Sequence, residues 1–369
     1  MNSVRLGLGV FYHLFIAALE NVLSDLHAAY RVQQIMWVSL ALFALLMANS
    51  TPVLCSLEVR YSICPPAAVE SGTGSLDSLD GTSLSYRIWQ TSSDEFLPER
   101  IILILPGIGM HGGFYGDVAE YLRQRDWAVY AMDYRGHGLS GGTKGELGVH
   151  TDVMADIDAM VCFIRHHHPQ GELFLLGESM GALFALAYAA KRPARTSGQI
   201  LAAPALAAHT RQLLCLEALY LPLFHVFAPG EPVIDLVGWR LELSSRDAKF
   251  KRSRAQDPLA LKRISLQYLG TLWSFQDGWR ERYPGSIRTP TFIIQGRHDE
   301  VVEPVYTEEL YRLIKTEEKK LMILPDAWHT LFFDPDSAQV LEAISGWLED
   351  FSRTKDTNEG DGTSGSTNK

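Results

Sequence analysis

The segment Gly177-Glu178-Ser179-Met180-Gly181 places a serine between two glycines, directly after the apolar run LFLL and directly before the apolar run ALFALAYAA. This pattern is typical of a nucleophile elbow, a sharp strand-to-helix turn that exposes a serine hydroxyl. The flanking glycines are needed because a side chain at either position would collide with neighbouring backbone. Ser179 is therefore the candidate nucleophile, and the alternative is a serine in an ordinary Gly-rich connection.

A serine hydroxyl is a poor nucleophile until a base takes its proton, so a carboxylate and a histidine should follow it in the chain. Asp299 follows the apolar run TFIIQ in the turn QGRHD, and His329 follows the apolar run KLMIL after one short loop. Of the twelve histidines, His329 alone comes after the acid and leaves a strand for a loop. Glu300, Glu303 and Asp326 are rival acids.

Attack by a serine on a carbonyl also needs two backbone N–H groups to hold the oxyanion. Met180, the residue after the serine, supplies the first. The loop LPGIGMHGG over residues 105–113 follows an early apolar run and offers the second, with Ile108 the preferred donor and Gly109 the next candidate. So many glycines in one loop indicate close approach of the backbone.

The elements that must position these residues alternate along the chain from Leu84 onward. Apolar runs of strand length are followed by segments with helical periodicity, which predicts a mostly parallel central sheet with helices on both faces. The predicted strands cover residues 84–90, 101–105, 128–132, 173–176, 199–203, 291–295 and 320–324. The predicted helices cover residues 116–125, 151–166, 180–190, 305–313 and 338–351.

Four motifs in this order, PGIGMHGGFY, DYRGHGLSGG, GESMG and QGRHD with a later histidine, resemble the monoacylglycerol lipase group of α/β-hydrolases, also called the serine aminopeptidase S33 or lysophospholipase-like family. The resemblance covers roughly residues 80–350. It implies the α/β-hydrolase fold, hydrolysis of monoacylglycerols or related esters, no metal, and Ser179, Asp299 and His329 as the triad. Many members carry His-Gly where this chain has Pro106-Gly107, a change that leaves backbone donation intact.

Other polar clusters invite a catalytic or metal-binding interpretation. Asp133, Arg135 and His137 in DYRGHGLSGG are interpreted as parts of a structural turn. The run His166–His168 falls at a helix end, where neighbouring side chains point about 100° apart and do not converge on one ion. No cofactor is expected.

The segment 207–285, between the elbow and the acid, breaks the alternation. It begins with LLCLEALYLPLFHVFAP (Leu213–Pro229) and continues into the basic stretch KFKRSRAQDP. We expect a helical cap that forms an acyl pocket and excludes water from the oxyanion. The alternative is a helical pair that packs on the core without touching substrate.

The two ends of the chain differ from the catalytic region in composition. Residues 1–64 contain two apolar stretches, Leu6–Leu19 and Ile35–Ala48, which are candidates for a signal peptide, a membrane anchor or amphipathic helices packed on the catalytic domain. Membrane association is favoured, with a cytoplasmic location as the alternative. Residues 65–83 are predicted to be a linker, residues 84–352 the hydrolase domain, and residues 353–369 a disordered tail.

The composition excludes some classes of function. The net charge of -10 would repel a phosphate backbone, so nucleic acid is not an expected partner. Cys55, Cys64, Cys162 and Cys215 show no zinc-site spacing, although Cys55 and Cys64 could pair in an oxidising compartment.

The sequence thus predicts a serine hydrolase that cleaves carboxylic esters of lipid-like substrates, of monoacylglycerol or lysophospholipid type. An acyltransferase or a peptidase would use the same triad and differ in the acceptor or the bond cleaved. A binding module that keeps the fold without catalysis is the third alternative.

Overall fold

The computed structural model describes residues 72–90, 100–207, 232–236 and 239–361. Both N-terminal apolar stretches, the run Leu213–Pro229 and three of the four cysteines lie outside these ranges, so the expectations placed on them stay predictions. None of the described helices is both long enough and apolar enough to cross a bilayer.

A central sheet of eight strands forms the middle layer of the domain, in the order β1-β2-β4-β3-β5-β6-β9-β10. β2 runs antiparallel to both β1 and β4, and the other neighbouring pairs are parallel, as the alternating pattern predicts. The strands are β1 (Gly72–Asp77), β2 (Ser83–Trp89), β3 (Arg100–Leu105), β4 (Ala128–Met132), β5 (Glu172–Glu178), β6 (Gly198–Ala202), β9 (Thr291–Gly296) and β10 (Lys319–Leu324).

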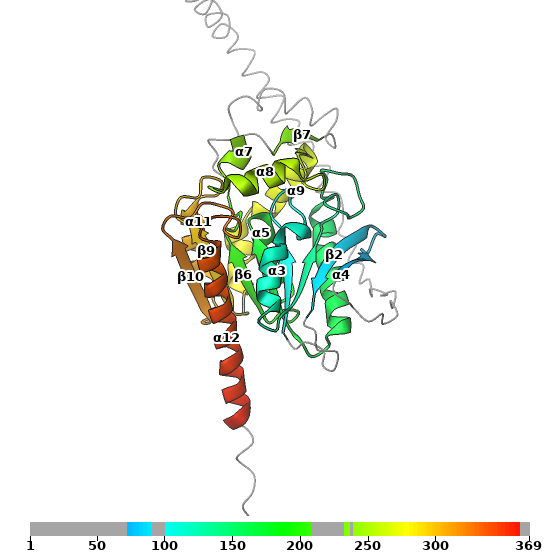
Figure 1. Cartoon of the computed structure of the whole chain (residues 1–369). Helices are drawn as coiled ribbons and strands as arrows, with labels where there is room; N and C mark the ends of the chain where they lie inside the picture. Colours follow the sequence, from blue (N-terminus) through cyan, green and yellow to red (C-terminus); the bar gives the residue numbers. More distant parts are fainter. Residues whose placement is uncertain (1–71, 91–99, 208–231, 237–238, 362–369) are drawn as a thin grey trace, which may run out of the picture. The chain divides into compact units, whose positions relative to one another are not determined.

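Helices cover both faces of this sheet, so the central strands are buried on both sides and consist of continuous apolar runs. α4, α5 and α11 pack on one face, and α3 and α12 on the other, where Figure 1 shows them in front of the strands. The helices are α3 (Gly116–Arg123), preceded by the short η1 (Gly112–Tyr115), α4 (His150–His167), α5 (Met180–Lys191), α11 (Pro304–Leu313) and α12 (Ser337–Asp361). The α/β architecture expected from the sequence is confirmed.

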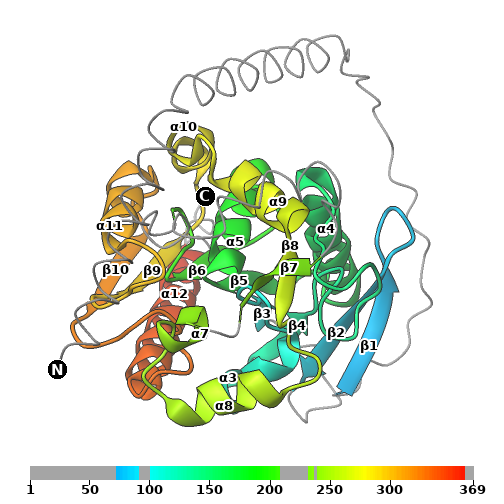
Figure 2. The same cartoon turned by 90° about the horizontal axis from the view of Figure 1, so that it is seen from above.

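The described part of the segment 207–285 lies at the end of the sheet where the parallel strands terminate (Figures 1 and 2). A small antiparallel pair, β7 with β8, leads into helices there. Its elements are β7 (Pro232–Asp235), α7 (Trp239–Glu242), α8 (Ala248–Gln256), β8 (Arg263–Ser265), α9 (Leu266–Gln276), α10 (Trp279–Arg282) and the short η3 (Pro284–Ser286).

Two boundaries drawn from the sequence are wrong. The expected linker 65–83 contains β1, whose six residues all pair with β2, and Ser78 after it is buried and donates a hydrogen bond to Asp156. The strand was missed because five of its six residues are exposed or glycine, so the segment shows no apolar alternation. The expected disordered tail after Ser352 begins as helix, since α12 continues to Asp361.

A buried ion pair joins the β1–β2 end of the sheet to α4. Arg135 donates to both carboxylate oxygens of Asp156, over 2.6 and 2.7 Å, and to Asp80 over 2.8 Å. Asp156 is fully buried.

Replacing Asp156 by alanine should therefore leave the Arg135 charge buried with only two partly exposed partners, Asp80 at 2.8 Å and Asp152 at 3.8 Å. We expect a loss of about 3–5 kcal/mol in the free energy of unfolding, measured by urea denaturation. Asp117→Ala, on the exposed first turn of α3, is the control and should cost less than about 1 kcal/mol. Equal stability of the two variants would contradict the structural role assigned to this pair.

Candidate active site

The backbone of Ser179 is strained, with φ 56° and ψ −115°, at the junction between β5 and α5. Few non-glycine residues adopt this region, which is characteristic of a nucleophile elbow. A Cβ atom on Gly177 would overlap the backbone of Gly181, and one on Gly181 would overlap the carbonyl oxygen of Leu105. The two glycines thus allow α5 to start close against β3 and β5.

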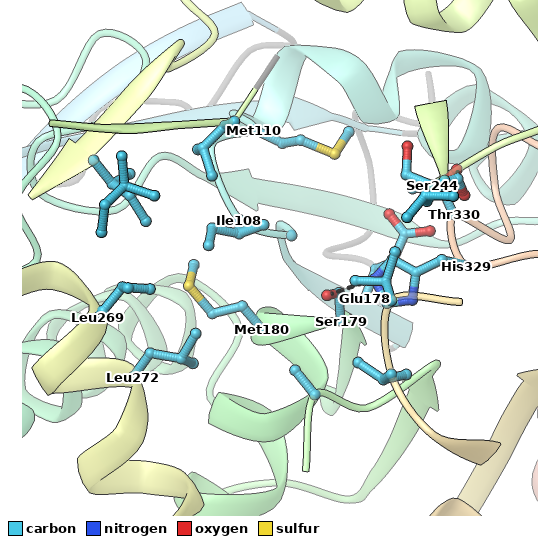
Figure 3. A pocket seen from close by; sticks show the side chains of 18 of the residues that line it. Ile108, Met110, Glu178, Ser179, Met180, Ser244, Leu269, Leu272, His329 and Thr330 are labelled. Atoms are coloured by element: carbon cyan, nitrogen blue, oxygen red, sulfur yellow. Dashed lines mark hydrogen bonds between the residues drawn. The ribbon is translucent and has the colours of Figure 1, made fainter. Parts of the chain in front are cut away.

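Ser179, His329 and Asp299 form one continuous hydrogen-bonded chain, of which Figure 3 shows Ser179 and His329. The Ser179 hydroxyl lies 2.8 Å from Nε2 of His329, and Nδ1 of His329 lies 2.8 Å from Oδ2 of Asp299. Because the carboxylate can only accept, Nδ1 donates to it and the neutral ring leaves Nε2 free to accept from the serine. All three residues are buried, with exposures of 6% or less.

The structure also distinguishes Asp299 from the rival acids. Oδ1 of Asp299 accepts hydrogen bonds from the N–H groups of Val301 and Val302, and its Oδ2 accepts a further one from Gln295. These contacts point the carboxylate at His329. Glu300 and Asp326 are exposed and Glu303 precedes α11, and none of these three pairs with His329.

The loop after β3 uses nearly every backbone polar group of residues 107–109. The N–H of Gly107 donates to the Tyr115 hydroxyl, and the carbonyl of Ile108 accepts from Arg254. The carbonyl of Gly109 accepts from the N–H of Leu261. The N–H of Gly109 lies near the Tyr268 hydroxyl. Burial raises the pKa of Tyr268, and this N–H opposes the rise.

Two residues of the pocket that contains Ser179 have a backbone N–H without an acceptor in the described part of the chain. These residues are Ile108 and Met180. Ile108 and Met180 are the two donors expected from the sequence. The N–H of the alternative donor, Gly109, lies near the Tyr268 hydroxyl.

Glu178 links the elbow to this loop and was not assigned a role from the sequence. It is fully buried, and its Oε2 accepts a hydrogen bond of 2.8 Å from Tyr115, the residue that also accepts from Gly107. Its only hint in the sequence is a charged residue at the end of an otherwise apolar strand.

The electrostatics couple Glu178 to the histidine. Burial raises the pKa of Glu178 to about 7, although the Tyr115 hydrogen bond and His329 oppose the rise. Burial lowers the pKa of His329, but the neighbouring charge of Asp299, its hydrogen bond and Glu178 outweigh burial, so that the pKa is raised overall. The base form of His329 is thus the form present above this raised pKa.

The pocket around Ser179 is mostly apolar. Figure 3 shows Ile108, Met180, Leu269 and Leu272 together on one side of Ser179, while Ser244 and Thr330 lie on the side of His329. The lining residues contributed by the segment 207–285 are Ile234, Leu236, Leu243, Ser244, Arg254, Ile264, Leu269, Leu272, Trp273 and Gln276.

The polar motif DYRGHG does not contribute to this pocket. Asp133 accepts from Arg87 and from the N–H groups of Gly112 and Leu139. His137 accepts at Nε2 from the Tyr268 hydroxyl, 3.0 Å away, because its Nδ1 donates to a backbone carbonyl. The motif therefore stabilises a turn and positions Tyr268, whose hydroxyl lies near the loop after β3.

The side chains of His166–His168 at the end of α4 do not converge on one point. His168 bonds the Tyr130 hydroxyl over 2.8 Å, whereas His167 donates to the carbonyl of Phe163. In the part of the chain that the structure describes, no group of three or more His, Cys, Asp or Glu side chains is arranged to hold a metal ion.

Comparison with known proteins places this geometry in a family. The model of the family described as serine aminopeptidase, S33 matches residues 97–336, more than half of the chain. The chain belongs to this family. A monoacylglycerol lipase of Mycolicibacterium smegmatis is 26% identical over 275 residues, which cover 74% of this chain and 95% of that protein.

Further relatives agree. The monoglyceride lipase of Homo sapiens is 25% identical over 289 residues, covering 76% of this chain and 92% of the human protein. The solved monoacylglycerol lipase of Paleococcus ferrophilus has a TM-score of 0.62 and 27% identity, and the match covers 72% of this chain and 98% of that structure. The expected family and the α/β-hydrolase fold are confirmed, and the chain is a carboxylic ester hydrolase.

The charge of Glu178 should be visible in the pH dependence of ester hydrolysis. The ionised carboxylate raises the pKa of His329, which must be neutral to act as a base, so activity is lost as the pH falls through that pKa. In Glu178→Gln the negative charge is absent, and the acidic limb of the kcat/KM profile should move to lower pH.

The control for this experiment is Asp117→Asn, which removes a charge on exposed α3 and should leave the limb in place. A limb that stays fixed or moves to higher pH in Glu178→Gln would contradict the coupling.

Proposed function

We propose that this protein hydrolyses carboxylic esters of lipid-like substrates, of monoacylglycerol or lysophospholipid type, through an acyl-enzyme on Ser179. The observation that carries the proposal is the position of His329, whose two ring nitrogens lie 2.8 Å from Ser179 and 2.8 Å from Asp299. This is the relay required for nucleophilic catalysis by a serine.

The proposed reaction has two halves. Oγ of Ser179 attacks the ester carbonyl while Nε2 of His329 takes its proton, and the N–H groups of Ile108 and Met180 stabilise the oxyanion. His329 then protonates the leaving alcohol as the tetrahedral intermediate collapses to the acyl-enzyme. In the second half, water gives a proton to His329 and attacks the acyl carbonyl. The bond between the acyl carbon and Oγ then breaks, the acid leaves, and His329 returns the proton to Oγ of Ser179. Asp299 holds the ring in the required tautomer throughout.

The preference for a lipid-like acyl group rests on the pocket and on the relatives. Apolar side chains such as Leu269 and Leu272 surround the approach to Ser179, and they would bury a hydrocarbon chain favourably. Similar proteins from a bacterium and from humans are named for the lipase reaction on monoacylglycerols.

Substitution of the relay should abolish turnover of p-nitrophenyl esters. We expect Ser179→Ala to lower kcat by about 10⁶-fold and Asp299→Asn by about 10⁴-fold, because the amide favours the wrong tautomer of His329. Asp326→Asn, at an exposed carboxylate, is the matched control and should keep the rate of the unaltered protein.

The chain-length profile tests the substrate class. With esters from acetate to palmitate, Ser179-dependent activity should peak at medium or long chains. A preference for acetate would indicate a small-ester hydrolase, and absence of any Ser179-dependent hydrolysis would contradict the proposal. Analysis of products with added alcohols or amines would show whether water or another acceptor takes the acyl group.

We further propose that the N-terminal region associates with membranes, which would bring the enzyme to its lipid substrate. The support is the composition of Leu6–Leu19 and Ile35–Ala48. The full chain should sediment with phosphatidylcholine vesicles, and Leu42→Lys with Leu45→Lys should reduce the bound fraction, because charged side chains are costly in the hydrocarbon region. Unchanged sedimentation of the double variant would count against an anchor at this stretch.

A further inference from the structure

Arg254 is a cation inside a mostly apolar active-site pocket. It lies on α8, it is 6% exposed, and it lines the same pocket as Ser179 and His329. Burial lowers the pKa of its guanidinium, a sign that the charge has been withdrawn from water. A buried charge of this kind is costly unless a partner compensates it.

The structure supplies only part of that compensation. Nη2 of Arg254 donates to the carbonyl of Ile108 over 2.8 Å. Among the described residues no carboxylate forms an ion pair with it. Glu178 is the carboxylate whose charge acts on the pKa of Arg254, but it accepts hydrogen bonds from Tyr115 and from the N–H of Phe332 instead. Its pKa of about 7 leaves it only partly ionised at neutral pH.

The position of Arg254 limits what its missing partner can be. Its hydrogen bond is to the carbonyl of Ile108, the same residue whose N–H is proposed to hold the oxyanion. The remaining walls, including Leu269 and Leu272, suit the acyl chain. An anion that reached Arg254 would therefore belong to the alcohol part of the ester, a few bonds from the carbonyl.

We propose that Arg254 is a specificity-determining residue that binds an anionic group, phosphate or carboxylate, on the alcohol part of the substrate. The proposal rests on the ester hydrolysis proposed above and narrows its substrate class to acidic lysolipids and related anionic esters. The planar guanidinium can donate two parallel hydrogen bonds to such a group. One N–H of its Nη2 keeps the contact with the carbonyl of Ile108.

The test compares esters that share one acyl chain and differ only in the alcohol. The full chain is assayed with 1-octanoylglycerol, 1-octanoylglycerol 3-phosphate and 3-octanoylglycerate, all as monomers in solution. The unaltered protein should show a higher kcat/KM for at least one anionic ester than for the neutral one. Arg254→Gln should lower kcat/KM for that anionic ester by about 10- to 100-fold, the range for a hydrogen bond to a charged group, and affect the neutral ester much less.

Two further variants separate charge from structure. Arg254→Lys keeps the charge and should retain part of the preference. Arg252→Gln removes an exposed charge from the same helix and should leave the preference intact. If Arg254→Gln does not fold, Arg254→Lys provides the comparison, because loss of the bidentate contact should still reduce the preference for the anionic ester.

Binding gives a readout that does not depend on turnover. The Ser179→Ala protein should bind 1-octanoylglycerol 3-phosphate or 3-octanoylglycerate more tightly than 1-octanoylglycerol in calorimetry, and Arg254→Gln in that background should remove the difference. An equal fall of kcat/KM on neutral and anionic esters would overturn the proposal, since it would mean that Arg254 only supports the oxyanion loop. Absence of Ser179-dependent hydrolysis of every ester would contradict the proposed function instead, a result that the binding experiment distinguishes.

Discussion

The strained backbone of Ser179 is the constraint around which the domain is organised. A residue at φ 56° costs of order 1–3 kcal/mol and persists only where its surroundings leave no alternative. Here β5 is buried on both faces, and α5 is buried along nearly its whole length from Met180 to Ala189. The junction between them cannot relax without exposing that core, so the hydroxyl is held toward His329 and the N-terminus of α5 toward the same pocket.

A second constraint acts on the loop after β3, because its backbone groups are shared among distant parts of the chain. Gly107 is bound by Tyr115 of η1, which in turn donates to Glu178 at the end of β5. The next two residues of the loop contact Arg254, Leu261 and Tyr268, which belong to the segment over the strand ends. The N–H of Ile108 has no acceptor among the residues that the structure describes. The orientation of this N–H group thus depends both on the core of the domain and on the elements that cover it. The elements that cover the pocket are therefore connected to the polar groups inside it.

Sequence patterns located the elements where apolar periodicity was strong and failed where it was weak. The buried strands β3, β5 and β9 and the helices that follow are nearly as predicted, since each must bury an apolar run. β1 was missed because an edge strand is held by backbone pairing with β2 and offers few buried side chains. The end of α12 was missed for a related reason: residues after Ser352 present no apolar stripe, yet a helix already formed extends at little cost.

The predicted nucleophile, the predicted general base and their order came from local sequence patterns, because each of these residues follows a recognisable strand. The sequence favoured Asp299 as the acid that orients His329 without excluding its three rivals, and it assigned no role to Glu178, Tyr115 or Arg254. The partners of these residues are set by the tertiary structure. Asp299 and His329 are 30 residues apart, and Ile108 and Arg254 are 146 apart, so their contacts arise only when strand ends and the covering segment are brought together. Local pattern specifies an element, whereas the partner of a buried charge depends on which elements the fold places beside it.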